Sequence, residues 1–226
     1  MFEVLPALAP DPILGLSAAF RADPNPKKID LGVGVYKDEQ GNTPIVGAVA
    51  QAQLRLLETE TSKTYITPQG VQGYIDGMLE LLLGKGNQAV LGNRVAAVQA
   101  PGGCGALRIL AELLKRCNDN GKVWVSDPTW ANHIPLIGNA GLELATYPYF
   151  DKNTASIKFD EMLATLKTIP KGDVVLLHAC CHNPTGADLT QDQWRQVAEA
   201  AQQQGWLPFI DSAYLGFGDD LETDAF

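Results

Sequence analysis

The chain has 226 residues, of which 46% are hydrophobic and 19% are charged, so it can bury the core of one α/β domain or slightly more. Its formal net charge of −9 disfavours nucleic acid and anionic membrane surfaces as partners. Because no apolar run is long enough to span a membrane and the N-terminus does not resemble a signal peptide, we expect a cytoplasmic protein. The four cysteines are too few for a disulfide framework, and we expect reduced thiols.

The first ninety residues predict three helices and one short extended segment. "APDPILGLSAAFRAD" is typical of a helix with Asp11 as its N-cap and Pro12 as its first residue. "KIDLGVGVY" is extended and is interrupted by Gly32 and Gly34. "NTPIVGAVAQAQLRLLETE" repeats the capping pattern, with Thr43 before a proline, and "VQGYIDGMLELLLG" predicts a further amphipathic helix.

From residue 94 the sequence alternates between strands and helices. The predicted strands are residues 94–100, 122–127, 142–150, 173–179 and 206–211, and the predicted helices are residues 102–119, 130–141, 159–169 and 190–205. Thr190 and Gln193 form a capping box for the last helix. Strands joined by helices of this length predict an α/β fold with a mainly parallel, buried sheet and helices on both faces.

Polar residues follow the predicted strands at their carboxyl ends, which is where sheets of this type bind ligands. They are Gly102 and Gly103, residues 127–130, residues 178–183 and residues 211–214. Glycines that open a helix expose backbone N–H groups to a phosphate, although they also suit a tight strand–helix turn. The spacing matches neither a Walker loop nor a dinucleotide-binding loop, so a single phosphate is the better interpretation.

Two histidines and two adjacent cysteines stand together after the strand at 173–179: His178, Cys180, Cys181 and His182. They lie in a turn, where the i, i+4 spacing of the histidines has no helical meaning, and adjacent cysteines suit a zinc site poorly. A thiol nucleophile would need a base and an electropositive pocket. We therefore interpret the cysteines as packing residues, and Asn183 with its following proline as the functional part.

Asp211 ends an apolar strand, where a buried carboxylate is costly unless it meets a cation or several hydrogen-bond donors. An N-cap or loop aspartate is the alternative interpretation. Tyr214 follows three residues later and could place a phenol beside the same ligand.

Five motifs stand in order along the chain: "LGVGVYKDE", "PGGCGALR", "SDPTWANH", "HACCHNPTG" and "FIDSAY". Together they resemble the class I aminotransferases of the aspartate and aromatic type, which are pyridoxal-phosphate enzymes of fold type I, and the resemblance runs from residue 2 to residue 226. It implies a homodimer that transfers an amino group between an L-amino acid, aspartate or aromatic, and a 2-oxo acid. It also implies an N-terminal segment, residues 1–45, that contributes to the small domain and the substrate site, and an incomplete cofactor-binding large domain, residues 46–226.

The resemblance assigns roles to the matching residues. Asp211 would pair with the pyridine nitrogen of pyridoxal 5′-phosphate, with His133 behind it. Asn183 and Tyr214 would donate to the phenolic oxygen of the cofactor. The remaining cofactor residues are Trp130, which stacks on the ring, Gly102, Gly103 and Cys104 of the phosphate loop, and Tyr65, which reaches the phosphate of the neighbouring subunit. The substrate-contacting residues are Gly34, Trp130 and Asn183.

Two departures from the family pattern concern the chemistry. Cys104 stands where the family carries a Thr or Ser hydroxyl, so one hydrogen bond to the phosphate becomes a weak S–H contact. The family's Schiff-base lysine lies in a Ser-x-Ser-Lys motif beyond the position of Asp211, whereas the last lysine here is Lys171. We therefore expect an N-terminal portion of an aminotransferase, with no catalytic residue and no metal in its site, that binds the cofactor without turnover. Another fold type I enzyme and a non-catalytic cofactor-binding remnant are the alternatives.

Two X–Pro peptide bonds lie at ends of predicted strands, Asp127–Pro128 and Asn183–Pro184. A generic X–Pro bond is cis in only about 5% of cases. The resemblance nevertheless implies a cis bond at both positions.

Overall fold

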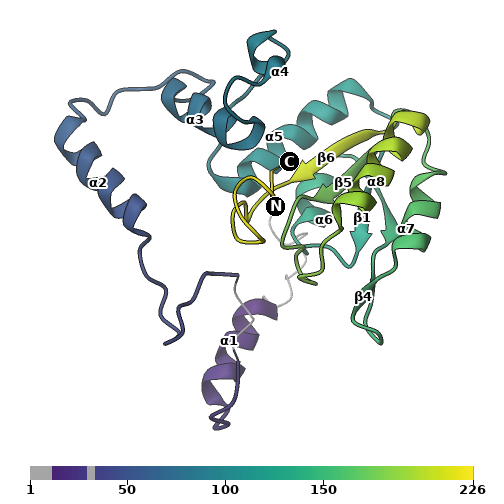
Figure 1. Cartoon of the computed structure of the whole chain (residues 1–226), viewed down its shortest axis with the longest axis horizontal. Coiled ribbons are helices and arrows are strands. Elements are labelled where there is room, and N and C mark those ends of the chain that lie inside the picture. Colours follow the sequence, from purple (N-terminus) through teal and green to yellow (C-terminus); the bar gives the residue numbers. More distant parts are fainter. Residues whose placement is uncertain (1–11, 30–33, 226) are drawn as a thin grey trace, which may run out of the picture. The chain divides into compact units, whose positions relative to one another are not determined.

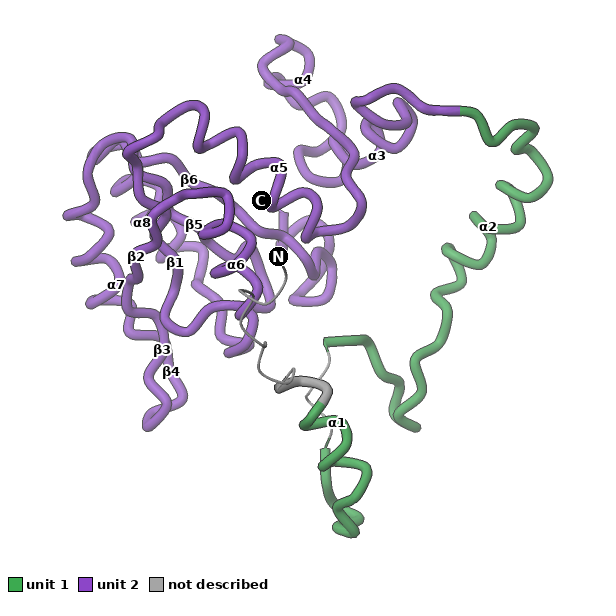
Figure 2. The backbone as a smooth tube through the Cα atoms, turned by 180° about the vertical axis from the view of Figure 1, so that it is seen from behind, with its two compact units in different colours: residues 1–64 green, residues 65–226 purple. Residues whose placement is uncertain are grey.

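The computed structural model describes residues 12–29 and 34–225, and the chain divides into two compact units, residues 1–64 and 65–226 (Figure 2). The described part of the first unit contains the helices α1 (Pro12–Ala22) and α2 (Gly47–Thr59). Helix α1 begins at Pro12, as the sequence predicts. Its predicted N-cap, Asp11, lies outside the described residues, as do residues 30–33 of the predicted extended segment.

The predicted cap of α2 is wrong. The helix begins at Gly47, and the residue before it, Val46, is extended (φ −58°, ψ 133°) and makes no side-chain hydrogen bond to the first turn. Ile45 and Val46 are β-branched, which disfavours helical conformation, so the chain stays extended past the proline. Thr43 therefore precedes the helix by about one turn and does not cap it.

The second unit is built around a four-stranded parallel sheet (Figure 1). Its helices are α3 (Gln72–Leu83), α4 (Gln88–Leu91), α5 (Gly102–Cys117), α6 (His133–Gly138), α7 (Phe159–Leu166) and α8 (Gln191–Gln204). Its strands are β1 (Lys122–Asp127), β2 (Glu143–Pro148), β3 (Phe150–Asp151), β4 (Ser156–Ile157), β5 (Val174–His178) and β6 (Leu207–Asp211). The sheet has the order β2-β1-β5-β6 with every neighbouring pair parallel, and β3 pairs with β4 antiparallel. The predicted α/β fold with a mainly parallel sheet is confirmed.

Strand β5 contributes to a core on each face of the sheet because its side chains alternate in direction. Val175 and Leu177 pack with residues of α7 and α8, whereas Val174 and Leu176 pack with residues of α5 and α6. All four are buried, which explains why the strand is a continuous aliphatic run instead of an apolar–polar alternation. Helices therefore cover both faces, as predicted.

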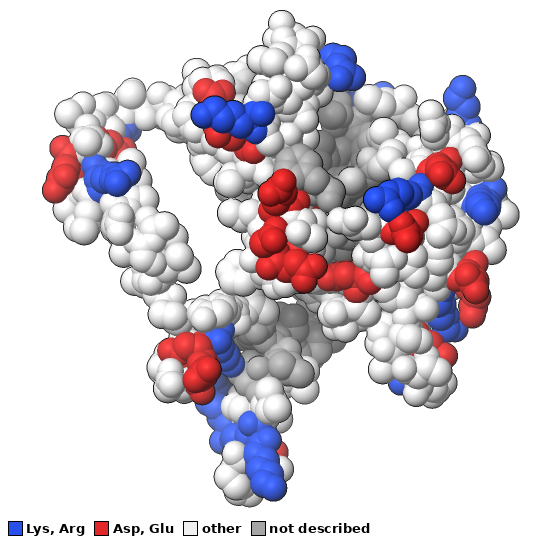
Figure 3. Space-filling model, viewed as in Figure 1, with Lys and Arg blue, Asp and Glu red and all other residues white. Residues whose placement is uncertain are grey.

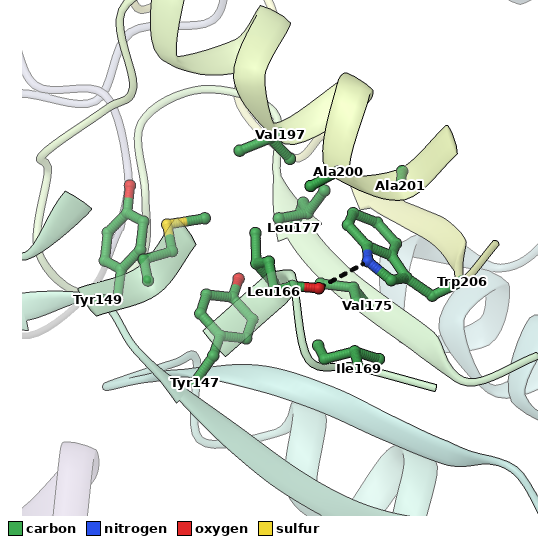
Figure 4. Packing of buried hydrophobic residues seen from close by; sticks show 11 residues of the cluster. Tyr147, Tyr149, Leu166, Ile169, Val175, Leu177, Val197, Ala200, Ala201 and Trp206 are labelled. Carbon is green, nitrogen blue, oxygen red and sulfur yellow. Dashed lines mark hydrogen bonds between the residues drawn. The ribbon is translucent and has the colours of Figure 1, made fainter. Parts of the chain in front are cut away.

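The core on the α7–α8 side contains large aromatic side chains whose polar atoms are paired (Figure 4). Trp206 Nε1 donates to the carbonyl oxygen of Leu166 at 3.1 Å. Tyr147 Oη donates to the carbonyl oxygen of Leu176 at 2.8 Å. These bonds avoid the desolvation penalty that an unpaired buried N–H or O–H would add.

The predicted strand at residues 94–100 is wrong, because the structure gives this segment no regular secondary structure. The backbone N–H of Gln99 donates to the carbonyl oxygen of Gln69 at 2.8 Å, and its side-chain Oε1 accepts the N–H of Val71 at 2.9 Å. The segment is thus bonded to a loop. An apolar pattern alone does not form a strand, since the strand also needs a neighbouring backbone in register.

Two local predictions are confirmed. Thr190 Oγ1 accepts the N–H of Gln193 at 3.3 Å, and the Gln193 side chain accepts the N–H of Thr190 at 2.9 Å, which completes the capping box of α8. The Asp127–Pro128 and Asn183–Pro184 bonds are both cis. Among the residues that the structure describes, no helix is long and apolar enough to cross a membrane.

Acidic side chains gather over the segment that follows β6 (Figure 3). Asp224 organises this segment, because its carboxylate accepts the backbone N–H groups of Gly216, Gly218 and Asp219 at 2.8–3.0 Å. This acidic segment thus folds around one of its own carboxylates and is not a basic surface of the kind that binds nucleic acid.

Candidate functional site

Three parallel strands end together at the carboxyl edge of the sheet, β1 at Asp127, β5 at His178 and β6 at Asp211. Helix α5 packs against β1 and is joined to it by residues 118–121, so it runs antiparallel to the strand and begins at the same edge. The sequence predicts four strand ends here. The structure instead gives three strand ends and the start of α5, because residues 94–100 form no strand.

All three histidines of the chain meet at this edge. The ring centroids of His133 and His178 are 5.1 Å apart, and those of His178 and His182 are 4.0 Å apart. Burial lowers the pKa of His178 to about 3, with further lowering by the two neighbouring imidazoles, and burial lowers the pKa of His182 to about 4. Both rings are therefore neutral at neutral pH.

The hydrogen bonds of His178 and His133 run in one direction. The backbone N–H of Asn183 can only donate, and it points to His178 Nδ1 at 3.4 Å. Neutral His178 then carries its proton on Nε2, 3.2 Å from Thr129 Oγ1, and the Thr129 hydroxyl is left to donate to Nδ1 of a neutral His133 ring at 2.7 Å. His133 Nε2–H is left to donate to Asp211 Oδ2 at 2.9 Å. The tautomer of a neutral His133 ring thus follows from the Asn183 peptide group, through the His178 ring and the Thr129 hydroxyl.

The other predicted site residues that follow these strands differ in their contacts. Trp130 meets the ring of His133 edge-on, with centroids 5.3 Å apart and an interplanar angle of 88°. The Asp211 side chain is 18% exposed, and among the described residues its second oxygen, Oδ1, has no hydrogen-bond partner. Within the same described part of the chain, no residue hydrogen-bonds the carboxamide of half-buried Asn183. Tyr214 is half-buried as well.

The start of α5 offers backbone donors and space. Its N-cap residue, Pro101, provides no side-chain hydrogen bond, so the N–H groups of the first turn are uncapped by side chains. Gly102 has φ +71°, a conformation that favours glycine. A Cβ added at Gly102 or Gly103 would meet nothing within 4 Å, and the Cys104 thiol is exposed. These features suit an anion at the helix N-terminus.

For two further predicted site residues the structure describes no contact with this group. The Tyr65 side chain is fully exposed (101%), so it contacts none of the groups above. Gly34 belongs to the first unit and is exposed. Their roles stay predictions.

In the "HACCHNPTG" segment, the ring nitrogens of His182 are engaged with protein groups. His182 Nε2 lies 2.9 Å from Ser126 Oγ and its Nδ1 lies 2.9 Å from Thr185 Oγ1. Burial raises the pKa of Cys180 to about 12, so this thiol stays protonated. Within residues 12–29 and 34–225, no cluster of three or more His, Cys, Asp or Glu side chains is arranged to hold a metal ion.

Sequence reasoning missed two residues of this edge. Thr129 links two histidines, and its only sequence signal is its position four residues before His133, a spacing that also fits a helix start. Ser126 contacts His182 from near the end of β1, and a serine on a strand carries no comparable signal. Both contacts depend on which strands are neighbours.

Comparison with known proteins agrees with the geometry. Residues 26–225 match the family model of aminotransferase class I and II. The aspartate aminotransferase of Salmonella typhi is 48% identical over 100% of this chain and 57% of its own length. The aromatic-amino-acid aminotransferase of Paracoccus denitrificans is 52% identical over 96% of this chain and 54% of its own length. The solved structure of the aromatic-amino-acid aminotransferase of Burkholderia pseudomallei, covalently bound to pyridoxal phosphate, has a TM-score of 0.94 and 44% identity, and the match covers 100% of this chain and 56% of that one. The chain thus spans little more than half the length of these relatives.

Proposed function

Because this chain belongs to the class I and II aminotransferase family, we propose that it binds pyridoxal 5′-phosphate at the carboxyl edge of its sheet. The enzyme that it represents then transfers an amino group between an L-amino acid, aspartate or aromatic, and a 2-oxo acid. The observation that carries the proposal is the Asp211 carboxylate, fixed on one side by an oriented His133 and open on the other. The names of the similar proteins, aspartate and aromatic-amino-acid aminotransferases, support the substrate class.

The residues at this edge fit that cofactor by their chemistry. A carboxylate suits a protonated pyridine nitrogen, and Asp211 has one oxygen to offer. Asn183 and Tyr214 provide donors for a phenolic oxygen, and Trp130 provides an aromatic face for the ring. The start of α5 provides backbone N–H groups, the positive end of the helix dipole and open space beside Gly103 for a phosphate.

Bound pyridoxal phosphate supplies an electron sink that stabilises negative charge at the α-carbon of the substrate. Asp211 keeps a proton on the pyridine nitrogen, since a neighbouring carboxylate favours the charged form of that group. His133 donates its Nε2–H to Asp211 Oδ2 and so holds the carboxylate in one orientation. Thr129 and His178 hold His133 in the tautomer that can donate.

The residues described above bind and orient the cofactor in this proposal, but none of them transfers the α-proton of the substrate. Transfer of the α-proton needs a general base beside the cofactor, and a lysine amine serves in the family that the sequence resembles. None of the lysines among residues 12–29 and 34–225 belongs to the group of side chains at the sheet edge described above. The relatives extend well beyond the matched length, and the proposal assigns the base to that additional part.

The proposal extends to assembly, domains and location. A homodimer is part of the proposal, in which the fully exposed Tyr65 side chain reaches the cofactor phosphate of a neighbouring subunit. Gly34 contacts the substrate in this scheme, residues 1–45 contribute to the small domain, and residues 46–226 form the cofactor-binding domain. Cys104 gives the phosphate a weak S–H contact in place of a hydroxyl. The location is cytoplasmic.

Absorbance titration of the chain with pyridoxal phosphate tests the proposal. We expect saturable one-to-one binding that Asp211→Ala and Asp211→Asn both weaken at least tenfold, about 1.4 kcal/mol. Asp160→Asn, which removes an exposed carboxylate from the first turn of α7, is the matched control and leaves the dissociation constant unchanged. Borohydride reduction followed by peptide mapping labels no single lysine. Binding that is indifferent to Asp211, or specific labelling of one lysine with measurable transamination, contradicts this account.

A further inference from the structure

The loop between β5 and α8, residues 179–190, is closed by a carboxylate of its own. Asp188 Oδ2 accepts the backbone N–H of Cys181 at 2.6 Å, and Asp188 Oδ1 accepts the N–H of His182 at 2.8 Å. Cys181 has φ +49°, a left-handed conformation that turns its N–H and the next one toward the same point. Two successive N–H groups arranged in this way form an anion-binding concavity, and here the Asp188 side chain occupies it.

Further contacts complete the closure on the other side of Asn183. Thr185 Oγ1 lies 2.9 Å from His182 Nδ1 and accepts the N–H of Ala187 at 3.2 Å. The N–H of Gly186 donates to the carbonyl oxygen of His182 at 2.7 Å. His182 itself is buried and its ring stacks on Tyr149 with centroids 4.0 Å apart. The residues before and after Asn183 are therefore both tied to fixed groups.

Asn183 differs from its neighbours in one respect. Its backbone N–H is used by His178, but among the described residues its carboxamide has no partner. Such a group is useful to a ligand only if the backbone that carries it is held still, because loss of rotational freedom on binding would otherwise weaken the contact. The Asp188 carboxylate accepts the N–H groups of the two residues that directly precede Asn183, Cys181 and His182.

We propose that Asp188 is a positioning residue, whose carboxylate fixes the loop so that the Asn183 carboxamide is presented to the phenolic oxygen of pyridoxal phosphate. The role of Asn183 in this proposal rests on the proposed function, whereas the action of Asp188 on the loop does not. Asp188 acts through Asn183 and does not touch the cofactor. A carboxylate is required because both of its oxygens accept, whereas a carboxamide would turn an NH₂ group toward one of the two N–H donors.

The first arm of the test needs no cofactor. In Asp188→Asn, we expect amide hydrogen exchange at His182 to accelerate at least tenfold and the side-chain order parameter of Asn183 to fall. Asp188→Glu, which keeps two acceptors, restores part of the protection. Asp192→Asn is the matched control, since it removes a carboxylate four residues away that pairs with Arg195 at the surface, and it leaves both signals unchanged. Unchanged exchange and order in Asp188→Asn overturn the proposal.

The second arm measures the dissociation constant of pyridoxal phosphate and the absorbance-derived pKa of its bound phenolic oxygen. Asp188→Asn weakens binding severalfold and raises that pKa, as Asn183→Ala does. In the double variant the two effects coincide instead of adding, because both remove the same contact. Additive effects show that Asp188 does not act through Asn183 and overturn the proposal. If the wild-type chain binds no pyridoxal phosphate, the proposed function fails, and the cofactor-free arm still decides whether Asp188 positions the Asn183 side chain.

Discussion

Helices α2 and α8 have 13 and 14 residues and both carry apolar side chains at helical spacing, yet their surroundings differ. Helix α8 begins with a capping box and buries Val197, Ala200 and Ala201, whereas α2, described over its whole length, has no side-chain cap and no buried residue. Tertiary packing thus stabilises α8, while α2 depends on its intrinsic propensity, which is marginal for a helix of this length. An amphipathic pattern specifies the helix but not its partner.

The largest expected contrast between the two units is their response to acid. All three histidines lie in the second unit, and the pKa values of His178 and His182 are about 3 and about 4 in the folded chain. Both pKa values lie below the value of about 6.5 for an unfolded histidine. The contribution of these histidines to the free energy of unfolding is therefore complete above about pH 6.5, and it is lost as the pH falls toward their pKa values in the folded chain. For two such groups the free energy of unfolding falls by about 3 kcal/mol between pH 6.5 and pH 5.

Urea unfolding followed by tryptophan fluorescence measures this effect, since all four tryptophans lie between residues 124 and 206. Ring-proton titration by NMR is the control, and it should show two imidazoles that stay neutral at pH 5. Stability that is constant over this pH range would contradict the neutral histidine cluster.

A matched pair of valines tests the packing difference directly. Val197→Ala in α8 removes two buried methyl groups from a side chain that is 2% exposed and should destabilise the second unit by about 2 kcal/mol. Val49→Ala in α2 changes a side chain that is 50% exposed, and alanine has the higher helix propensity, so stability should change by less than about 0.5 kcal/mol. The measurement is the free energy of unfolding of each variant. Equal losses would show that α2 is buried as deeply as α8.

The smallest expected effect compares two threonines that the sequence presents as equivalent caps. Thr190→Ala removes the acceptor of the Gln193 N–H and should cost about 1 kcal/mol. Thr43→Ala should cost almost nothing, because α2 begins at Gly47 without a side-chain cap. Helix content and denaturant midpoints of the two variants measure the difference. A loss at Thr43 that equals the loss at Thr190 would restore Thr43 as the helix cap.

Apart from the short antiparallel pair β3–β4, which the sequence did not predict, the elements between residues 102 and 211 could be predicted to within a few residues, because buried aliphatic strands and amphipathic helices leave strong patterns. β1 runs from Lys122 to Asp127 as predicted. Residues 94–100 have the same apolar character but form no strand, and the bonds of Gln99, through its backbone N–H to Gln69 and through its side chain to Val71, tie the segment to a loop. Register and partners are long-range properties, and local periodicity does not contain them.

For the candidate site, motif resemblance indicated the residues but not how they are linked. The contact of His133 with Asp211 joins residues 78 positions apart, and the 3.2 Å contact between Thr129 and His178 joins residues 49 apart. Each contact arises because β1, β5 and β6 end at one edge. The spacing of His178 and His182, which suggests a helix face, has no such meaning in the turn, although the two rings lie in tilted contact, with centroids 4.0 Å apart and planes 33° apart.

The one-way hydrogen bonding from Asn183 to Asp211 also limits how charge can travel. Every link points its hydrogen toward the carboxylate, and the first donor is a peptide N–H that cannot be replenished by a preceding group. A relay would have to strip that peptide of its proton or reverse every hydroxyl and imidazole at once. The row of rings therefore orients the hydrogen bond at Asp211 but does not conduct protons to it. Any proton that reaches this carboxylate arrives from its open side.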